Sequence, residues 1–182
     1  MSRNYKFKNP EGLYFVSFAT VYWIDVFIRS VYFECLVTNL NICVDKKGME
    51  IYSWCIMPSH VHLVFKSKIQ KPEDLLRDFK TFTSKQIVKL ITENVRESRK
   101  EWLLNAFQKA AKRNSNNSNF QFWQQHNNPI ELWSNEVIDQ KIDYIHNNPV
   151  EAGFVEYDYE YLHSSARDYC NVKGLVTLSK EE

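Results

Sequence analysis

Residues 55–65 read Cys-Ile-Met-Pro-Ser-His-Val-His-Leu-Val-Phe, which places histidines at positions 60 and 62. Side chains alternate between the two faces of a β-strand, so His60 and His62 should point the same way. Val61, Leu63 and Phe65 should then point the other way and pack into a core. Two neutral imidazoles side by side on an open strand face form a candidate pair of metal ligands. The alternative is a surface strand with two unrelated histidines.

The sequence on either side predicts alternating strands and helices. Strands are expected at residues 13–20, 50–57 and 60–66, with a further short strand at 120–124. Helices are expected at residues 29–43, from Pro72 onward, at 98–112 and at 135–147. Residues 45–48 are expected to form a turn. Ser134 should cap the last helix at its beginning, and Pro149 should end it. This order predicts an α+β domain in which helices cover one face of an antiparallel sheet. The opposite face would remain available for a site.

Length and composition indicate a folded protein of one domain spanning residues 1–182, with its core at about residues 12–167. Apolar residues make up 44% of the chain and aromatic residues 15%, which is typical of a globular fold. No apolar run approaches the roughly 20 residues that span a bilayer. The first six residues lack an apolar signal core, so we expect a cytoplasmic protein. Four cysteines without a Cys-x-x-Cys spacing argue against a structural zinc site or a disulfide framework.

Positive charge is concentrated in one part of the chain. The net charge is only +1, but residues 77–113 contain ten basic and four acidic residues, which gives this segment +6 and leaves −5 elsewhere. Such a segment can bind the phosphates of a nucleic acid. It can equally be the solvated face of helices.

A second candidate group lies in the helix expected before Pro149. Tyr144 and Asn148 are four residues apart and would be neighbours on one helix face. A tyrosine hydroxyl can act as a nucleophile, and an amide oxygen can bind a hard metal ion. From spacing alone, two structural roles are the favoured explanation: Tyr144 at the edge of a core, and Asn148 in the turn before proline. The residue before a proline also tends to leave helical geometry, which weakens the spacing argument.

The chain resembles the HUH-type transposases that use a single catalytic tyrosine, within the IS200-like superfamily, and especially the REP-associated tyrosine transposases. The resemblance covers roughly residues 12–167 and is carried by two main motifs in the expected order. The first is Met-Pro-Ser-His-Val-His-Leu-Val at 57–64, and the second is Asp-Tyr-Ile-His-Asn-Asn-Pro-Val-Glu-Ala-Gly-Phe-Val at 143–155. Residues 77–80 and 122–124 also look like family segments.

This resemblance implies a ferredoxin-like antiparallel sheet with the histidine pair on its central strand. The family's metal ligands fall on His60, His62 and Asn148, and its nucleophile falls on Tyr144. His146 is left as a structural or DNA-contacting residue. Relatives act on single-stranded DNA, often folded as a hairpin. They occur as monomers and as homodimers that exchange the tyrosine helix, and such a protein would associate with the nucleoid when bound to DNA.

The implied reaction is cleavage and rejoining of DNA through a 5′-phosphotyrosine, assisted by Mg²⁺ or Mn²⁺. Free tyrosine has a pKa of about 10, so the nucleophile needs a nearby base or positive charge. The expected DNA contacts are six basic residues and one aromatic: Arg77, Lys80, Lys85, Arg96, Arg99, Lys100 and Trp123. Phe122 or Trp123 could instead pack in the core. The rival functions are a catalytically silent DNA-binding domain and a metal-dependent hydrolase that activates water and tolerates loss of Tyr144.

Overall fold

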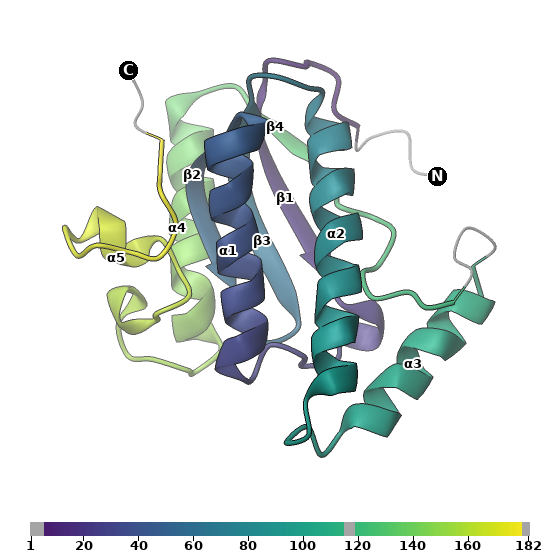
Figure 1. Cartoon of the computed structure of the whole chain (residues 1–182). Helices are drawn as coiled ribbons and strands as arrows, with labels where there is room; N and C mark the ends of the chain where they lie inside the picture. Colours follow the sequence, from purple (N-terminus) through teal and green to yellow (C-terminus); the bar gives the residue numbers. More distant parts are fainter. Residues whose placement is uncertain (1–5, 115–118, 180–182) are drawn as a thin grey trace.

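The computed structural model describes residues 6–114 and 119–179, and its centre is a four-stranded antiparallel sheet (Figure 1). The strands are β1 (Leu13–Ala19), β2 (Met49–Ile56), β3 (His60–Ser67) and β4 (Ile130–Leu132). Their order across the sheet is β2-β3-β1-β4. β3 is therefore an inner strand, hydrogen-bonded to β2 on one side and to β1 on the other.

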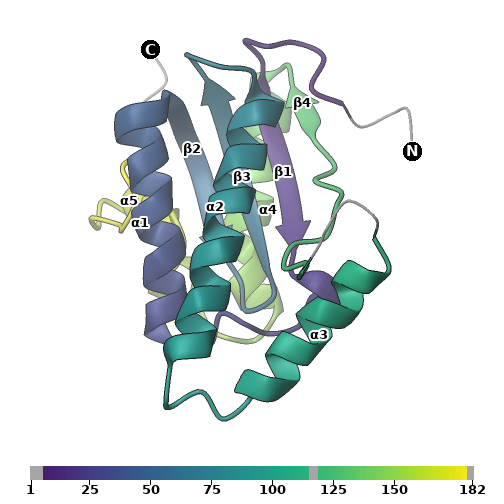
Figure 2. The same cartoon turned by 45° about the vertical axis from the view of Figure 1, so that its right-hand side comes forward.

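Helices lie on both faces of this sheet (Figures 1 and 2). α1 (Ser30–Lys47) and α2 (Pro72–Glu93) cover one face, and α4 (Asn135–Glu151) crosses the other and contacts β2, β3 and β4. α3 (Lys100–Lys112) lies beyond the end of α2, beside the short turn η1 (Val21–Trp23). η2 (Asp158–Glu160) and α5 (Ala166–Tyr169) follow α4. The predicted antiparallel α+β fold is confirmed, but the sheet face expected to be open is partly covered by α4.

The alternation along β3 divides the hydrophobic residues between two cores. Val61, Leu63 and Phe65 are completely buried in the main core between the sheet and the helices α1 and α2. On the other face, a smaller cluster under α4 contains Val64 and Ile145. The strand thus presents its histidines beside the smaller cluster, as its sequence pattern predicts. No described helix has the length and hydropathy needed to cross a membrane.

Several predicted boundaries differ from the structure. α1 continues through Lys47, where a turn was expected, and ends at Gly48, whose φ of 69° is the left-handed geometry that favours glycine. Residues 120–124 do not form a strand; the only pairing seen there is an isolated bridge between Thr20 and Trp123. The fourth strand is instead β4, which pairs with the beginning of β1. The six-residue segment searched for a signal core lies outside the described residues except for Lys6.

The prediction that Pro149 ends the last helix is wrong, because α4 runs on to Glu151. Asn148 keeps helical geometry: its side-chain Nδ2 donates to the backbone oxygen of Tyr144 at 2.7 Å. Its own backbone oxygen accepts from the Ala152 N–H at 3.0 Å. Proline removes one helical hydrogen bond, and here the burial of Pro149 and Ile145 against the protein offsets that loss. Tyr144 and Asn148 consequently remain one helical turn apart.

His146 anchors α4 to the sheet and to the carboxyl-terminal segment. Its Nε2 lies 2.8 Å from the Ser165 Oγ and 3.2 Å from the Ser53 Oγ, both within hydrogen-bond distance. The ring also meets the edge of Tyr169 at a centroid distance of 4.8 Å. Burial lowers the pKa of His146 below its usual value. This side chain therefore has a structural role in holding the helix that carries Tyr144.

The buried His146 should make the stability of the protein depend on pH. Below about pH 6.5 the unfolded chain binds a proton at this histidine that the folded chain excludes, so the free energy of unfolding should fall as the pH falls. One such group contributes a slope of up to about 1.4 kcal/mol per pH unit. Urea unfolding of His146→Gln at several pH values should show a smaller slope than the parent. His126→Gln, which alters an exposed histidine, should leave the slope unchanged; equal slopes in all three proteins would contradict the assignment.

Candidate active site

His60 and His62 lie side by side at the beginning of β3, on the face crossed by α4. Their ring centroids are 4.7 Å apart, which confirms the same-face arrangement predicted from the alternation. His62 is only 3% exposed, however, so it does not lie on an open strand face. Phe15 from β1 stacks on its ring at a centroid distance of 5.8 Å. Residues from a neighbouring strand and from α4 thus enclose a histidine that the sequence pattern placed in solvent.

Both imidazoles are held in the neutral form that can bind a metal ion. Burial is the main cause that lowers the pKa of His62 to about 3, and the neighbouring His60 and Lys141 contribute to the same shift. Burial also lowers the pKa of His60. The two ring nitrogens of His62 are buried without a hydrogen-bond partner among the described residues. Such orphaned nitrogens are costly, and a bound cation would satisfy one of them.

The orientation of His60 is fixed by its neighbours. Its Nδ1 lies 3.1 Å from the Ser59 hydroxyl oxygen, within hydrogen-bond distance. On its other side, the indole of Trp23 meets the ring at a centroid distance of 5.3 Å. A hydrogen bond at Nδ1 leaves Nε2 as the nitrogen that can face a ligand.

α4 places Tyr144 over His62. The two rings meet edge to face with centroids 5.3 Å apart, and Phe15 contacts Tyr144 at 5.9 Å. Tyr144 is 44% exposed, and its hydroxyl makes no hydrogen bond with the described residues. A buried histidine and an accessible tyrosine hydroxyl thus belong to one cluster. Both come from the same chain, so a second copy is not needed to bring them together.

Asn148 completes the set of residues predicted to hold a metal ion. Its amide raises the pKa of both His60 and His62 against the effect of burial, which is the expected influence of an adjacent oxygen acceptor. Its Nδ2 is used by the helix backbone, so Oδ1 is the atom left for the rings or a ligand. The described residues contain no cluster of three His, Cys, Asp or Glu side chains that could hold a metal ion, and the third predicted donor is an amide. Two nitrogens and one oxygen fit a divalent cation.

Lys141 belongs to the same cluster, although sequence analysis did not select it. Its Nζ lies 5.4 Å from the centre of the Tyr144 ring and 5.0 Å from that of Phe15. Lys141 precedes Tyr144 by three residues on α4, so the helical spacing could have indicated it. Phe15 and Trp23 could not be found in this way, because sheet register and a turn bring them to the histidines.

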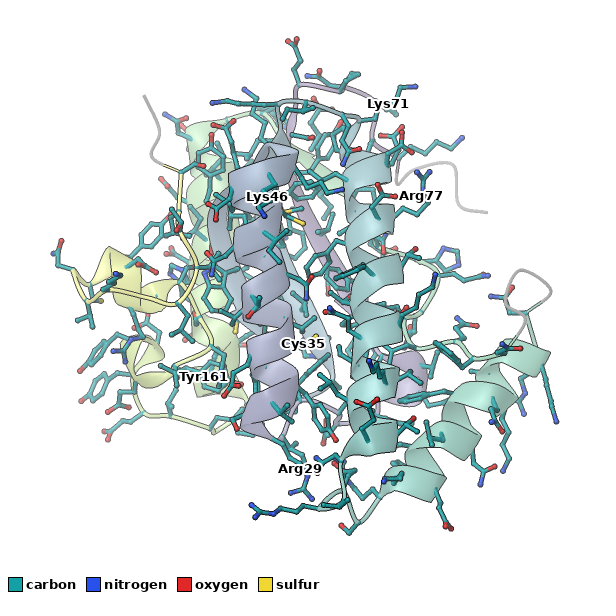
Figure 3. All side chains as sticks on the ribbon, in the orientation of Figure 1. Arg29, Cys35, Lys46, Lys71, Arg77 and Tyr161 are labelled. Carbon is teal, nitrogen blue, oxygen red and sulfur yellow. The ribbon has the colours of Figure 1, made fainter. Side chains whose placement is uncertain are left out.

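The basic residues predicted to bind DNA are distributed over other surfaces. Arg77 and Lys85 are exposed on α2, on the opposite side of the sheet from α4; Figure 3 labels Arg77 there, and its guanidinium pairs with Asp74 at 2.6 Å. Arg96 is exposed before α3, and Lys100 is half-buried at its first position. The structure does not bring Arg77 or Lys85 to the histidine pair.

Three of the predicted DNA contacts have side chains that are engaged within the protein. Trp123 is 6% exposed, packs against Phe18 and other core aromatics, and donates its Nε1–H to the Thr83 hydroxyl at 3.3 Å. Burial lowers the pKa of Lys80 to about 7, and its ammonium donates to the Gln124 carbonyl oxygen and to Asn127.

Arg99 is the third of these residues. Its Nε donates to the buried carboxylate of Glu97 at 3.2 Å, and its Nη1 donates to the Asp25 carbonyl oxygen at 2.7 Å. Arg29 pairs with the same carboxylate at 2.8 Å. These contacts tie the segment before α3 to α1, so the charge of Arg99 serves the fold.

Comparison with known proteins identifies a family and similar solved structures. The sequence model of the family described as Transposase IS200 like matches residues 14–148. A REP-associated tyrosine transposase, solved bound to a REP hairpin, is 15% identical; the alignment covers 99% of this chain and 93% of that one, with a TM-score of 0.64. A candidate transposase from Deinococcus radiodurans R1 is 21% identical over 81% of this chain and 95% of its own, with a TM-score of 0.43. No curated protein sequence matches the chain.

The family match includes both His60 and His62 and extends to Asn148, so it spans the whole cluster described above. The solved REP-associated transposase has the same fold. The chain therefore belongs to the family of IS200-like transposases.

Proposed function

We propose that this transposase cuts and rejoins single-stranded DNA through a covalent bond to Tyr144, next to a divalent cation held by His60, His62 and Asn148. The observation that carries the proposal is the continuous group formed by the accessible Tyr144 ring, the buried His62 and the adjacent His60. A purely structural group of this kind would be expected to satisfy both nitrogens of His62 with hydrogen bonds.

DNA is the proposed partner because of the family and the fold. Transposases act on DNA, and the solved protein with the same fold holds a REP hairpin. We extend this partner to the present chain as single-stranded DNA, including strands folded as hairpins. Arg77, Lys85, Arg96 and Lys100 remain predicted phosphate contacts. The first two would bind DNA on the side of the sheet away from Tyr144, so they would hold parts of the substrate distant from the cleaved bond.

The donor set favours Mg²⁺ or Mn²⁺. An amide oxygen suits both cations, and two imidazole nitrogens shift the preference toward Mn²⁺. When bound, the cation would polarise a phosphate oxygen and offset the charge that develops during cleavage. The protein's part is to keep both imidazoles neutral at physiological pH. Burial supports this, because it lowers the pKa of both rings, to about 3 for His62.

Tyr144 is the proposed nucleophile. Its Oη would form a bond to phosphorus while the bond from phosphorus to the 3′ oxygen breaks, leaving a 5′-phosphotyrosine and a free 3′-hydroxyl. This intermediate keeps the energy of the broken linkage, so a strand can be rejoined without ATP. Phe15 and His62 position the Tyr144 ring by edge-to-face contacts. The positive charge of Lys141 beside this ring would offset the negative charge that develops on the reacting phosphate.

Lys141 should contribute to the rate of cleavage. Lys141→Met should lower the cleavage rate at neutral pH by about tenfold, because the positive charge beside the reacting phosphate is lost. Lys141→Arg should retain most of the rate. The measurement is the initial rate of DNA cleavage by each variant at neutral pH. An unchanged rate in Lys141→Met would remove Lys141 from the mechanism.

The experiment that tests the proposed function is a denaturing gel with end-labelled single-stranded DNA and Mn²⁺. The expected products are a shortened strand and a band in which protein is covalently attached to DNA. Binding without either product would favour the catalytically silent DNA-binding domain. Cleavage without the covalent band would favour a hydrolase that activates water.

A further inference from the structure

Two consecutive aromatic residues in η1 adopt a costly backbone conformation. Tyr22 has a φ of 59° and Trp23 a φ of 55°, the left-handed region that bulky residues rarely occupy. The turn is held by Thr20, whose hydroxyl donates to the Ile24 oxygen at 2.7 Å and whose N–H donates to the Ser59 oxygen at 2.8 Å. Despite these restraints, both aromatic side chains remain about half exposed. Packing therefore does not explain why this turn carries a tyrosine and a tryptophan.

The exposed aromatics of η1 form one wall of a cleft whose other wall is α3. The cleft has a volume of about 580 Å³, and Figure 2 shows α3 beside the turn between β1 and α1. Across from Trp23, α3 contributes Trp102, which is 56% exposed. Lys109 and Arg113 line the same cleft. The site thus combines large flat apolar surfaces with two cations.

This cleft begins next to the histidine pair. The Trp23 indole is 5.3 Å from the ring of His60, which is 4.7 Å from the ring of His62. Tyr144 follows at 5.3 Å from His62. A strand whose phosphate lies between Tyr144 and the histidines would therefore have Trp23 within reach.

We propose that the cleft between η1 and α3 binds unpaired nucleotides of the substrate strand next to the cleaved phosphate. Bases stack on Trp23 and Trp102, with Tyr22 as an additional surface, and Lys109 and Arg113 contact the phosphates. Aromatic platforms beside basic residues are the physical basis of single-strand binding without strict sequence preference. The inference rests on the proposed function, because that function supplies the strand at His60.

Three features favour single-stranded DNA over other occupants. The base faces of a duplex are covered by stacking, so Trp23 and Trp102 would find no flat surface there. The two cations complement a phosphate backbone. Finally, Trp23 lines the cleft and also contacts the ring of His60, where the proposed substrate strand lies.

The test is the affinity of the full chain for a fluorescein-labelled oligothymidylate, measured by fluorescence anisotropy in EDTA so that no metal-dependent cleavage occurs. Trp23→Ala combined with Trp102→Ala should weaken binding by at least about tenfold, because two stacking surfaces are lost. Trp133→Ala is the matched control: this tryptophan is 80% exposed and follows β4, which pairs with the opposite end of β1 from η1. The control should bind like the parent protein.

Two further double variants separate the contribution of stacking to affinity from the contribution of charge and from any effect of misfolding. Trp23→Phe with Trp102→Phe keeps flat rings and should retain more affinity than the alanine pair, which guards against misfolding as the cause. Lys109→Ala with Arg113→Ala should reduce the slope of log affinity against log salt by about 1.4, as expected for two lost phosphate contacts to a single strand. A duplex of the same base composition should compete poorly.

The result that overturns the proposal is unchanged affinity in the alanine pair, or an equal loss in the Trp133→Ala control. Absence of any binding to the oligothymidylate by the parent protein would also overturn it, and would leave the cleft open to a protein partner. These outcomes are distinct from failure of the proposed reaction, because the assay needs neither the cation nor the Tyr144 hydroxyl. A protein that binds through Trp23 and Trp102 but never forms a covalent adduct would refute the reaction alone.

Discussion

Replacing Tyr144 with phenylalanine should abolish DNA cleavage and the covalent protein–DNA adduct together. The substitution removes the oxygen that would bond to phosphorus, and loss of a nucleophile typically lowers turnover by at least about a thousandfold. The ring contacts to Phe15 and His62 are retained. Because the hydroxyl has no hydrogen-bond partner among the described residues, the fold should keep its stability. DNA affinity should also be unchanged.

The measurement is the denaturing gel with end-labelled single-stranded DNA and Mn²⁺, run beside an anisotropy titration of the same variant. Tyr159→Phe is the matched control, since Tyr159 is 43% exposed and lies on η2. This control should cleave at the parental rate. If Tyr144→Phe cleaves as fast as the parent, water is the nucleophile and the hydrolase interpretation replaces ours.

Replacing either histidine should abolish the DNA cleavage that depends on a divalent cation. We expect His60→Ala and His62→Gln each to lower the rate by at least about a hundredfold, because a cation with three protein donors loses one of them. Glutamine is chosen at position 62 because His62 is buried beneath Phe15 and Tyr144, where alanine would leave a cavity. Thermal unfolding should confirm that both variants remain folded.

A direct titration with Mn²⁺ separates binding from catalysis. The parent should bind one Mn²⁺ per chain by calorimetry, and the double variant that combines His60→Ala with His62→Gln should bind none with comparable affinity. His126→Ala removes an exposed histidine outside the cluster and should bind Mn²⁺ like the parent. Full cleavage by the double variant, or equal Mn²⁺ affinity in all proteins, would refute the metal site.

The sequence alone determined which side chains share a face of a single strand or helix. Alternation along residues 60–65 placed the histidines on one face and Val61, Leu63 and Phe65 in the core, as observed. Helical spacing placed Tyr144 and Asn148 on one face of α4. The two motifs together also identified the family. These inferences succeeded because the periods of strands and helices are fixed by backbone geometry, so neighbours along one element follow from position in the chain.

Only the tertiary structure decided which elements meet and what their contacts allow. α4 covers β3, so His62 is buried under Tyr144, whereas the sequence pattern placed it on an open face. Trp123, selected as a base-stacking residue, packs in the core, while Trp23 is exposed beside His60. Lys80 and Arg99, selected as cations for DNA, bind protein acceptors instead. Composition cannot distinguish a side chain that is free to contact DNA from one that is engaged within the protein, because the surroundings of a side chain come from distant segments.

Pro149 shows the same limit within a helix. Local preference predicted that α4 would end before it, but packing of Ile145 and Pro149 against the protein keeps the helix intact to Glu151. Asn148 therefore stays one turn from Tyr144 and next to both histidines. Local preferences are worth a few kcal/mol at most, and burial of an apolar helix face can exceed them. The sequence thus pointed to His60, His62, Tyr144 and Asn148 as a candidate site, and long-range packing brought them together.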